Sequence, residues 1–287
     1  MAPDTAPPRP TNGRRQTAYW LLLTTLLGLP LVTPLLRWSS VACTHDGHLH
    51  YHRVAAMAHA WNNGIYLTRW LPDLAFGYGY PFFVYREAAP LYAVLLPFLA
   101  GLPLPAASNL FYAVTILLCG AFMFLWVRDL FGPRAALVSA VAYMAAPYIM
   151  VDALIRGNAP ESMALPLFPL LLWVGRRWVL FGSVRAFVVG VLGLALLSIS
   201  HNISTFLFAP TLLVYLAALT LLDRDQATTA DQLPPPGEHP SYLVSRISYL
   251  VIRHSSLVAW LASSLSSPSA SVWLFSTPAG RCWRWTR

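Results

Sequence analysis

Seven apolar runs, nearly free of charged residues, constrain this chain more than any other feature. They cover residues 20–36, 90–104, 110–127, 135–151, 163–174, 184–200 and 206–222. A helix needs about 20 mostly apolar residues to cross the hydrocarbon core of a bilayer. Hydrophobic residues make up 57% of the chain and charged ones 10%, with a mean hydropathy of +0.55, so the chain lacks the polar surface of a water-soluble globular protein. The sequence therefore predicts an all-α, polytopic helical membrane protein with about seven spans.

The arginines of the chain stand beside these apolar runs. The formal net charge is +8 at pH 7, but the basic residues form no continuous stripe. A nucleic-acid-binding surface requires such a stripe, so we exclude nucleic acid as a partner and interpret the arginines as signals of membrane orientation. Arg9, Arg14 and Arg15 precede the first run. The positive-inside rule therefore predicts a cytoplasmic N-terminal tail and an extracytoplasmic loop over residues 39–88.

Composition divides the chain into four parts. Residues 1–16 are rich in proline and lack apolar periodicity, which predicts a disordered tail. Residues 17–222 form the predicted transmembrane domain, and residues 223–240 a polar, proline-rich linker. The segment 241–287 is rich in serine with scattered arginine and tryptophan, and we interpret it as an atypical C-terminal tail. One hypothesis for this tail is a truncation or a shift of the reading frame.

The positions of two basic turns conflict with a simple count of spans. The turns at 128–134 and 176–185 both carry arginines and are both expected in the cytoplasm. If the runs 90–104 and 110–127 both cross the membrane, the first of these turns falls on the outer side. Either the run 90–104 is re-entrant, or the positive-inside rule is violated once. The sequence leaves both alternatives open.

The segment 44–53, THDGHLHYHR, is the strongest candidate for a functional site. It places Asp46 and several histidines where the first apolar run gives way to a polar loop. Ionisable groups beside a bilayer are costly and usually mark a functional site. Residues 48–63 follow as an amphipathic helix expected at the interface. The stretch 69–92 is dense in aromatics, glycine and proline, which predicts a segment at headgroup level without regular secondary structure.

Two interpretations of these polar residues stay open. His48 and His52 are four residues apart, so on a helix they share a face and, with Asp46, provide candidate metal ligands. Mg or Mn held by Asp46 through oxygen ligands is an alternative cofactor. The opposing interpretation is that the histidines are ordinary interfacial residues and that Asp46 caps the helix beginning near His48.

Further candidates for substrate binding lie elsewhere in the chain. Arg156 and Glu161 flank a short turn, where the arginine is either a bidentate phosphate ligand or a helix-end arginine paired with a nearby acid. Arg69 is a second phosphate candidate. Tyr78 and Tyr80 belong to an aromatic cluster that either cradles a sugar or polyprenyl tail or forms an interfacial belt.

Several short motifs, in order, resemble a known family. They are His45-Asp46-Gly47-His48, Arg69-Trp70-Leu71-Pro72, Gly77-Tyr78-Gly79-Tyr80-Pro81 with Phe83, Pro90-Leu91-Tyr92, Pro147-Tyr148, and Arg156-Gly157-Asn158-Ala159 with Glu161. Through them, residues 17–222 resemble prokaryotic integral membrane proteins described as 6-pyruvoyl-tetrahydropterin synthase-related, which are similar to GT-C glycosyltransferases. The apolar spans show no similarity to the soluble zinc enzyme that this description mentions.

The resemblance implies a function for the first loop. In a GT-C-like protein of the prokaryotic plasma membrane, Asp46 is expected to be the catalytic carboxylate, activating an acceptor hydroxyl or helping to hold a divalent cation. The expected donor is a polyprenyl-phosphate-linked sugar at the outer face of the membrane, and membrane lipid is the other expected partner. Two alternatives are a transporter component for lipid-linked glycans and a truncated, non-catalytic membrane protein.

Overall fold

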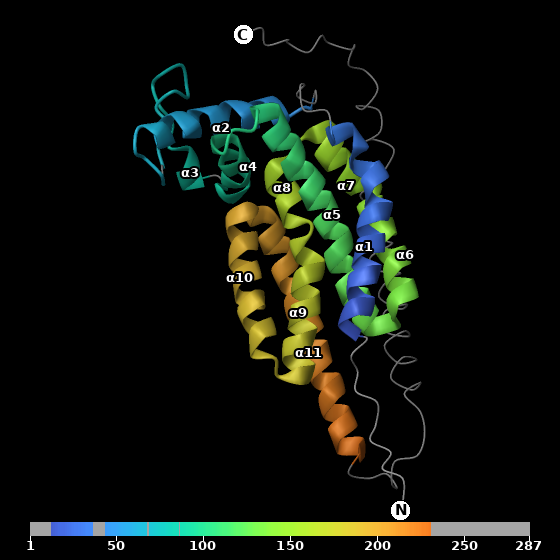
Figure 1. Cartoon of the computed structure of the whole chain (residues 1–287). Helices are drawn as coiled ribbons and strands as arrows, with labels where there is room; N and C mark the ends of the chain where they lie inside the picture. The colour runs from blue at the N-terminus through green and yellow to red at the C-terminus, as the bar shows by residue number, and fades with distance from the viewer. Residues whose placement is uncertain (1–12, 37–43, 68, 86, 231–287) are drawn as a thin grey trace, which may run out of the picture. The chain divides into compact units, whose positions relative to one another are not determined.

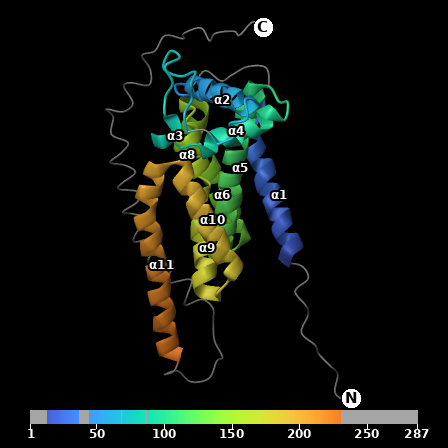
Figure 2. The ribbon, with the colours of Figure 1, turned by 90° about the vertical axis from the view of Figure 1, so that its left-hand side faces the viewer.

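The computed structural model describes residues 13–36, 44–67, 69–85 and 87–230, and these residues are almost entirely helical (Figures 1 and 2). The helices are α1 (Gly13–Val32), η1 (Thr33–Leu36), α2 (Gly47–Asn62), α3 (Phe82–Tyr85), α4 (Ala89–Leu99), α5 (Leu104–Phe131), α6 (Pro133–Met144), α7 (Pro147–Val151), η2 (Asp152–Arg156), α8 (Ala159–Ala164), α9 (Leu167–Phe181), α10 (Val184–Ser200) and α11 (Asn202–Ala230). In the described part of the chain, β pairing is limited to one isolated bridge between Leu71 and Tyr80. The prediction of an all-helical fold is confirmed.

Five of the described helical segments are long and apolar enough to cross a membrane. They are Arg15–Leu36, Leu104–Phe131, Pro133–Arg156, Ala159–Phe181 and Asn202–Leu221. The two remaining apolar runs form the shorter helices α4 and α10. The protein is therefore a polytopic helical membrane protein, while the count of seven spans stays a prediction.

Two predicted boundaries differ from the structure. Helix α1 begins at Gly13, inside the predicted tail 1–16, because Arg14 to Thr17 continue into the apolar run without a helix breaker. Helix α11 continues to Ala230, inside the predicted linker 223–240, because the first proline of that linker is Pro234. The rest of the tail, the rest of the linker and the segment 241–287 lie outside the described residues.

The arginine-bearing turns lie together at one end of the helices, which we call the arginine end. This end contains the start of α1, the α5–α6 turn and the α9–α10 turn (Figures 1 and 2). Gly132, with φ of 83°, ends α5 immediately before Pro133 starts α6. Gly182, with φ of 57°, ends α9, and the Ser183 hydroxyl accepts a hydrogen bond from the backbone N–H of Ala186 to start α10. Glycine and proline at these positions produce tight reversals.

The opposite end, which we call the loop end, carries α2, α3 and α4 (Figure 1). Helix α4 has 11 residues, about 16 Å of helix, which is half the thickness of a bilayer core. It packs beside α2 and α5, and Gly101, with φ of 102°, then reverses the chain into α5. Because α4 does not reach the arginine end, α5 begins at the loop end and ends at the arginine end. The α5–α6 turn therefore lies at the same end as the α9–α10 turn. This placement of the two turns is the one that the first alternative requires, in which the run 90–104 is re-entrant, and the re-entrant path stays a prediction.

Helix α5 is the centre of the helical domain, and small residues bring its neighbours close. A Cβ at Gly28 of α1 would lie 2.8 Å from Leu117 of α5, and one at Gly120 of α5 would clash with the sulfur of the fully buried Met144 of α6. Small residues at such crossings are typical of membrane helices. Half of the apolar stretch of α5 is buried in the protein, whereas less than a fifth of the apolar stretch of α11 is buried. Most of the apolar stretch of α11 therefore lies on the outside of the helical domain.

Candidate functional site

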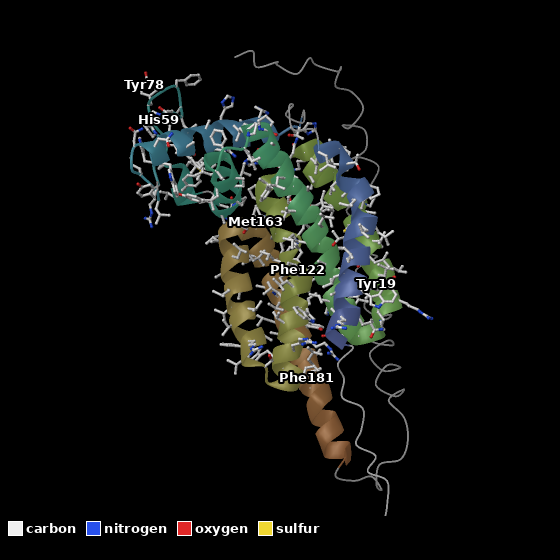
Figure 3. The ribbon with its side chains drawn as sticks, in the orientation of Figure 1. Tyr19, His59, Tyr78, Phe122, Met163 and Phe181 are labelled. Atoms are coloured by element: carbon white, nitrogen blue, oxygen red, sulfur yellow. The ribbon has the colours of Figure 1, made fainter. Side chains whose placement is uncertain are left out.

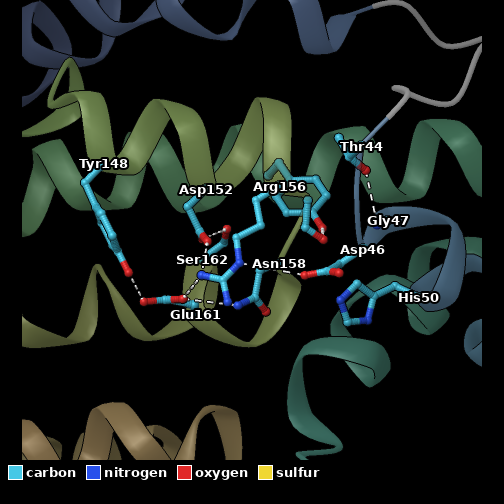
Figure 4. A network of polar contacts seen from close by, with 12 residues as sticks. Thr44, Asp46, Gly47, His50, Tyr148, Asp152, Arg156, Asn158, Glu161 and Ser162 are labelled. Carbon is cyan, nitrogen blue, oxygen red and sulfur yellow. Dashed lines mark hydrogen bonds and ion pairs between the residues drawn. The ribbon is translucent and has the colours of Figure 1, made fainter. Parts of the chain in front are cut away.

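Asp46 immediately precedes α2 at the loop end, but its side chain does not cap that helix. The hydroxyl of Thr44 accepts the hydrogen bond from the backbone N–H of Gly47, at 3.1 Å, and the Asp46 side chain makes no capping bond. The carboxylate of Asp46 is 43% exposed and faces Arg156 (Figure 4). The interpretation of Asp46 as a helix cap is therefore wrong, and its carboxylate is available for other contacts.

Backbone hydrogen bonds hold the segment before α2 against the end of η2. The N–H groups of His45 and Asp46 donate to the carbonyl oxygens of Ile155 and Arg156, at 3.1 and 2.8 Å. The η2 segment is a π-helix, a distortion often found at functional sites. These bonds place Asp46 beside Arg156, although the two residues are far apart in sequence.

Gly157 makes this approach possible. Its φ is 68°, in the left-handed region, and a Cβ at this position would lie 2.6 Å from the Cβ of Thr44 and 3.1 Å from the backbone nitrogen of Gly47. The buried hydroxyl of Tyr112 donates to the Gly157 carbonyl at 2.7 Å. A residue with a side chain would strain the backbone and force the first loop away.

Arg156 lies among three carboxyl groups, and we call these four residues the Arg156 cluster (Figure 4). Its Nη1 lies 2.6 Å from Oε2 of Glu161 and 3.5 Å from Oδ1 of Asp152, and its Nε lies 3.7 Å from Oδ2 of Asp46. Asp152 is the buried member, with a side chain 2% exposed, and it accepts a hydrogen bond of 2.8 Å from Ser162. Tyr148 and Asn158 donate to Glu161. The cluster thus extends from the protein interior to the loop-end surface.

The charges of the cluster determine what it can bind. Arg156 supplies one guanidinium, and Asp46, Asp152 and Glu161 supply three carboxyl groups. An added phosphate would meet more acidic than basic groups, whereas a hydroxyl or a cation would find acceptors. The sequence left two interpretations of Arg156, a phosphate ligand or an arginine paired with a nearby acid. Its ion pair with Glu161 matches the second interpretation. Arg156 is placed to orient Asp46 and is poorly placed to bind a phosphate.

His50 and Arg53 share one face of α2 with Asp46. They belong to the candidate segment 44–53, but the sequence predicted no separate role for either residue. They follow Asp46 by four and seven residues, the spacing of one helix face. His50 is buried and lies next to Asp46 (Figure 4). Nη1 of Arg53 lies 3.3 Å from Nδ1 of His50, and its guanidinium carbon lies 4.4 Å from the centroid of the Phe82 ring. The spacing from Asp46 was the signal that could have identified them.

His48 and His52 are both exposed, and they lie on a different side of α2 from the buried His50. The described residues contain no group of three or more histidine, cysteine, aspartate or glutamate side chains placed to hold a metal ion. The carboxyl groups of the Arg156 cluster lie around the guanidinium of Arg156. The predicted Mg or Mn site at Asp46, with or without the two histidines, stays a prediction.

The other predicted binding residues, Arg69, Tyr78 and Tyr80, belong to the loop that follows α2. Arg69 is exposed, and Tyr78 is 87% exposed at the tip of a loop near His59 (Figure 3). Paired backbone hydrogen bonds of 3.0 Å between Leu71 and Tyr80 close this loop. The structure therefore separates Tyr78 from the Arg156 cluster, whereas the ring of Tyr80 lies 6.3 Å from that of Phe82, the ring that contacts Arg53.

Tyr51 points from α2 toward α5 and is not a candidate base. Burial raises the pKa of its phenol to about 12, and a hydrogen bond with Ser108 opposes this shift. A tyrosine with this pKa stays protonated at physiological pH. Asp46 is thus the better-placed proton acceptor on this part of α2.

The fold and this cluster define a class of protein, a polytopic helical membrane protein with a polar site at one end of its helices. Comparisons with known proteins add no family to this class. No family model matches the chain, no curated protein matches it, and no solved structure matches it.

Proposed function

We propose that the protein is a membrane glycosyltransferase that uses a polyprenyl-phosphate-linked sugar at the outer face of the plasma membrane, with Asp46 as the general base. The observation that supports this proposal is the position of the Asp46 carboxylate. It is half exposed at the loop end, is held there by backbone bonds to η2, and lies 3.7 Å from Arg156. A base at the membrane surface can meet both a lipid-linked donor and a polar acceptor.

In the proposed reaction, Asp46 takes the proton from an acceptor hydroxyl while the acceptor oxygen forms a bond to C1 of the sugar. The bond between C1 and the phosphate oxygen breaks, and the polyprenyl phosphate leaves with the electron pair. Arg156 is a positioning residue, because its contacts with Asp152 and Glu161 fix the guanidinium that faces Asp46. Positioning of this kind is a large part of catalysis in such transfers.

The leaving phosphate requires positive charge. Arg53 lies on the same face of α2 as Asp46, about 10 Å along the helix axis, and its guanidinium is fixed by His50 and Phe82. This position suits Arg53 as the phosphate ligand better than the acid-rich surroundings suit Arg156. A divalent cation would supply similar charge, with Asp46 as its predicted ligand, but the proposed reaction does not depend on it.

Replacing Asp46 with asparagine tests the proposal. In membranes supplied with a labelled polyprenyl-phosphate sugar, Asp46→Asn is expected to lower the rate of transfer at least ~100-fold, the usual contribution of a general base. Binding of the labelled donor should persist. The matched control is Asp73→Asn, an exposed aspartate elsewhere in the first loop, which should keep wild-type transfer. Equal transfer by Asp46→Asn and Asp73→Asn would contradict the proposal.

A second candidate function is transport of lipid-linked glycans, supported by Asp152. This residue lies in a candidate span, is 2% exposed, and connects through Arg156 to Asp46 at the surface. Ionisable residues inside a span often belong to substrate or proton pathways. In proteoliposomes, loss of donor translocation in Asp152→Asn, without any glycosidic bond forming in the wild-type protein, would favour transport over transfer.

A further inference from the structure

A second network of charged side chains lies at the arginine end, away from the Arg156 cluster. The carboxylate of Asp129, near the end of α5, accepts hydrogen bonds from Arg177 and Trp173 of α9, at 2.8 and 2.9 Å. Arg128 also donates to Asp129 and, at 2.8 Å, to the hydroxyl of Thr17 in α1. Asp129 thereby pairs with two arginines and joins α5 to α9, while the bond from Arg128 to Thr17 joins α5 to α1.

Arg176 is adjacent to Arg177 on α9 but has no part in this network. Its Nε is buried and has no hydrogen-bond partner in the part of the chain that the structure describes. Its guanidinium carbon lies 5.8 Å from the centroid of the Phe181 ring at the end of α9. A guanidinium carries five N–H donors, and a buried donor without an acceptor is costly, most of all for a charged group. Because Nε is buried, an acceptor outside the protein can reach Arg176 only through Nη1 and Nη2, which are not among the buried unpaired atoms of the described residues.

The surroundings of Arg176 indicate the chemistry of the missing acceptor. Asp129 is the acid of this network and already accepts from Arg128 and Arg177, while Arg185 adds exposed positive charge at the α9–α10 turn. Exposed aromatic and apolar side chains flank these charges on α9 and α10: Trp178, Phe181, Val184, Phe187 and Val188. Phe181 lies at the arginine end of the helices, opposite Tyr78 and His59 (Figure 3). An acceptor with a negative charge and an apolar body suits both features.

We propose that the arginine end binds one anionic phospholipid, whose phosphate accepts hydrogen bonds from the guanidinium of Arg176. The acyl chains lie along the exposed apolar sides of α9 and α10. A lipid fits this place better than free phosphate, because Arg176 lies near the end of a candidate span, and the surface of a membrane-spanning helix faces acyl chains. Arginine is well suited to bind phosphate oxygens through its planar set of donors.

The test measures the thermal unfolding of the full-length protein in a zwitterionic detergent. Phosphatidylglycerol at about ten times its Kd is expected to raise Tm by roughly 3–6 °C. Phosphatidylcholine and inorganic phosphate, at the same phosphorus concentration, should each leave Tm unchanged. An equal rise with phosphatidylcholine would overturn the proposal, and an equal rise with inorganic phosphate would show a site for free anions in place of a lipid site.

The variant Arg176→Gln should lose most of the rise caused by phosphatidylglycerol. The matched control, Arg134→Gln, removes an exposed arginine from the same end and should keep the rise. Equal responses of the two variants would exclude a specific role for Arg176. Native mass spectrometry of the wild-type protein gives an independent reading that needs no variant. Preferential retention of one phosphatidylglycerol over phosphatidylcholine supports the proposal, and equal retention contradicts it.

Discussion

At the scale of single residues, two glycines and one aspartate govern the geometry of the candidate site. Asp46 offers a half-exposed carboxylate because Thr44 performs the capping of α2. Gly47 and Gly157 let the backbone before α2 approach the end of η2, and the hydroxyl of Thr44 fills the space beside both of them. Glycine is needed at position 157 for two separate reasons, its left-handed backbone and the closeness of Thr44.

The two reasons can be separated experimentally. Gly157→Ala and Gly182→Ala both place an alanine in the left-handed region, which costs about 1–2 kcal/mol. At Gly182 the space around the new Cβ is open, but at Gly157 the Cβ meets Thr44 and Gly47. Gly157→Ala should therefore lower the free energy of unfolding by about 1–3 kcal/mol more than Gly182→Ala, as overpacking does. Thermal unfolding of both variants in detergent measures the difference, and equal stabilities would contradict it.

At the scale of helices, the short α4 determines the end of the helical domain at which α5 begins. Its 11 residues remain at the loop end, so α5 begins there and ends at the arginine end. The α5–α6 and α9–α10 turns then fall on one side, as the positive-inside rule predicts for cytoplasmic turns. This arrangement also keeps α2 and the Arg156 cluster on the opposite side.

Labelling from one side of the membrane tests this arrangement. In a background with Cys43, Cys119 and Cys282 replaced by alanine, Ala100→Cys, after α4, should react with an impermeant thiol reagent from the same side as His59→Cys. Arg134→Cys, in the α5–α6 turn, should react from the other side. Ala100, His59 and Arg134 are all exposed. Reaction of Ala100→Cys together with Arg134→Cys would mean that α4 crosses the membrane.

At the scale of the whole helical domain, the polar side chains divide between two ends with different tasks. The Arg156 cluster at the loop end contains more acidic than basic groups, whereas Asp129 at the arginine end joins α5 to α9 through Arg177 and Trp173. In the Arg156 cluster the carboxylate of Asp46 is half exposed, whereas the carboxylate of Asp129 at the arginine end is mostly buried. We therefore expect the loop end to serve the reaction and the arginine end to serve stability.

Replacing Asp129 with asparagine should weaken the link between α5 and α9. A hydrogen bond to a charged group contributes about 1.5–3 kcal/mol, so Asp129→Asn should lower the free energy of unfolding by about that amount. Its transfer rate, measured below Tm, should stay near that of the wild-type protein. Asp46→Asn should show the reverse, with lost transfer and an unchanged Tm. A common loss of Tm in both variants would contradict this division.

The amino-acid sequence alone determined the helical, membrane-embedded class and the position of Asp46 beside α2. Both follow from local properties, because apolar run length sets the helices and the order of residues sets where a polar loop begins. Only the tertiary structure decided that α4 stays at the loop end and that Arg156, Asp152 and Glu161 meet Asp46. It also separated Tyr78 from this group. These outcomes depend on packing between helices far apart in sequence, where a π-helix and one left-handed glycine determine which side chains come into contact.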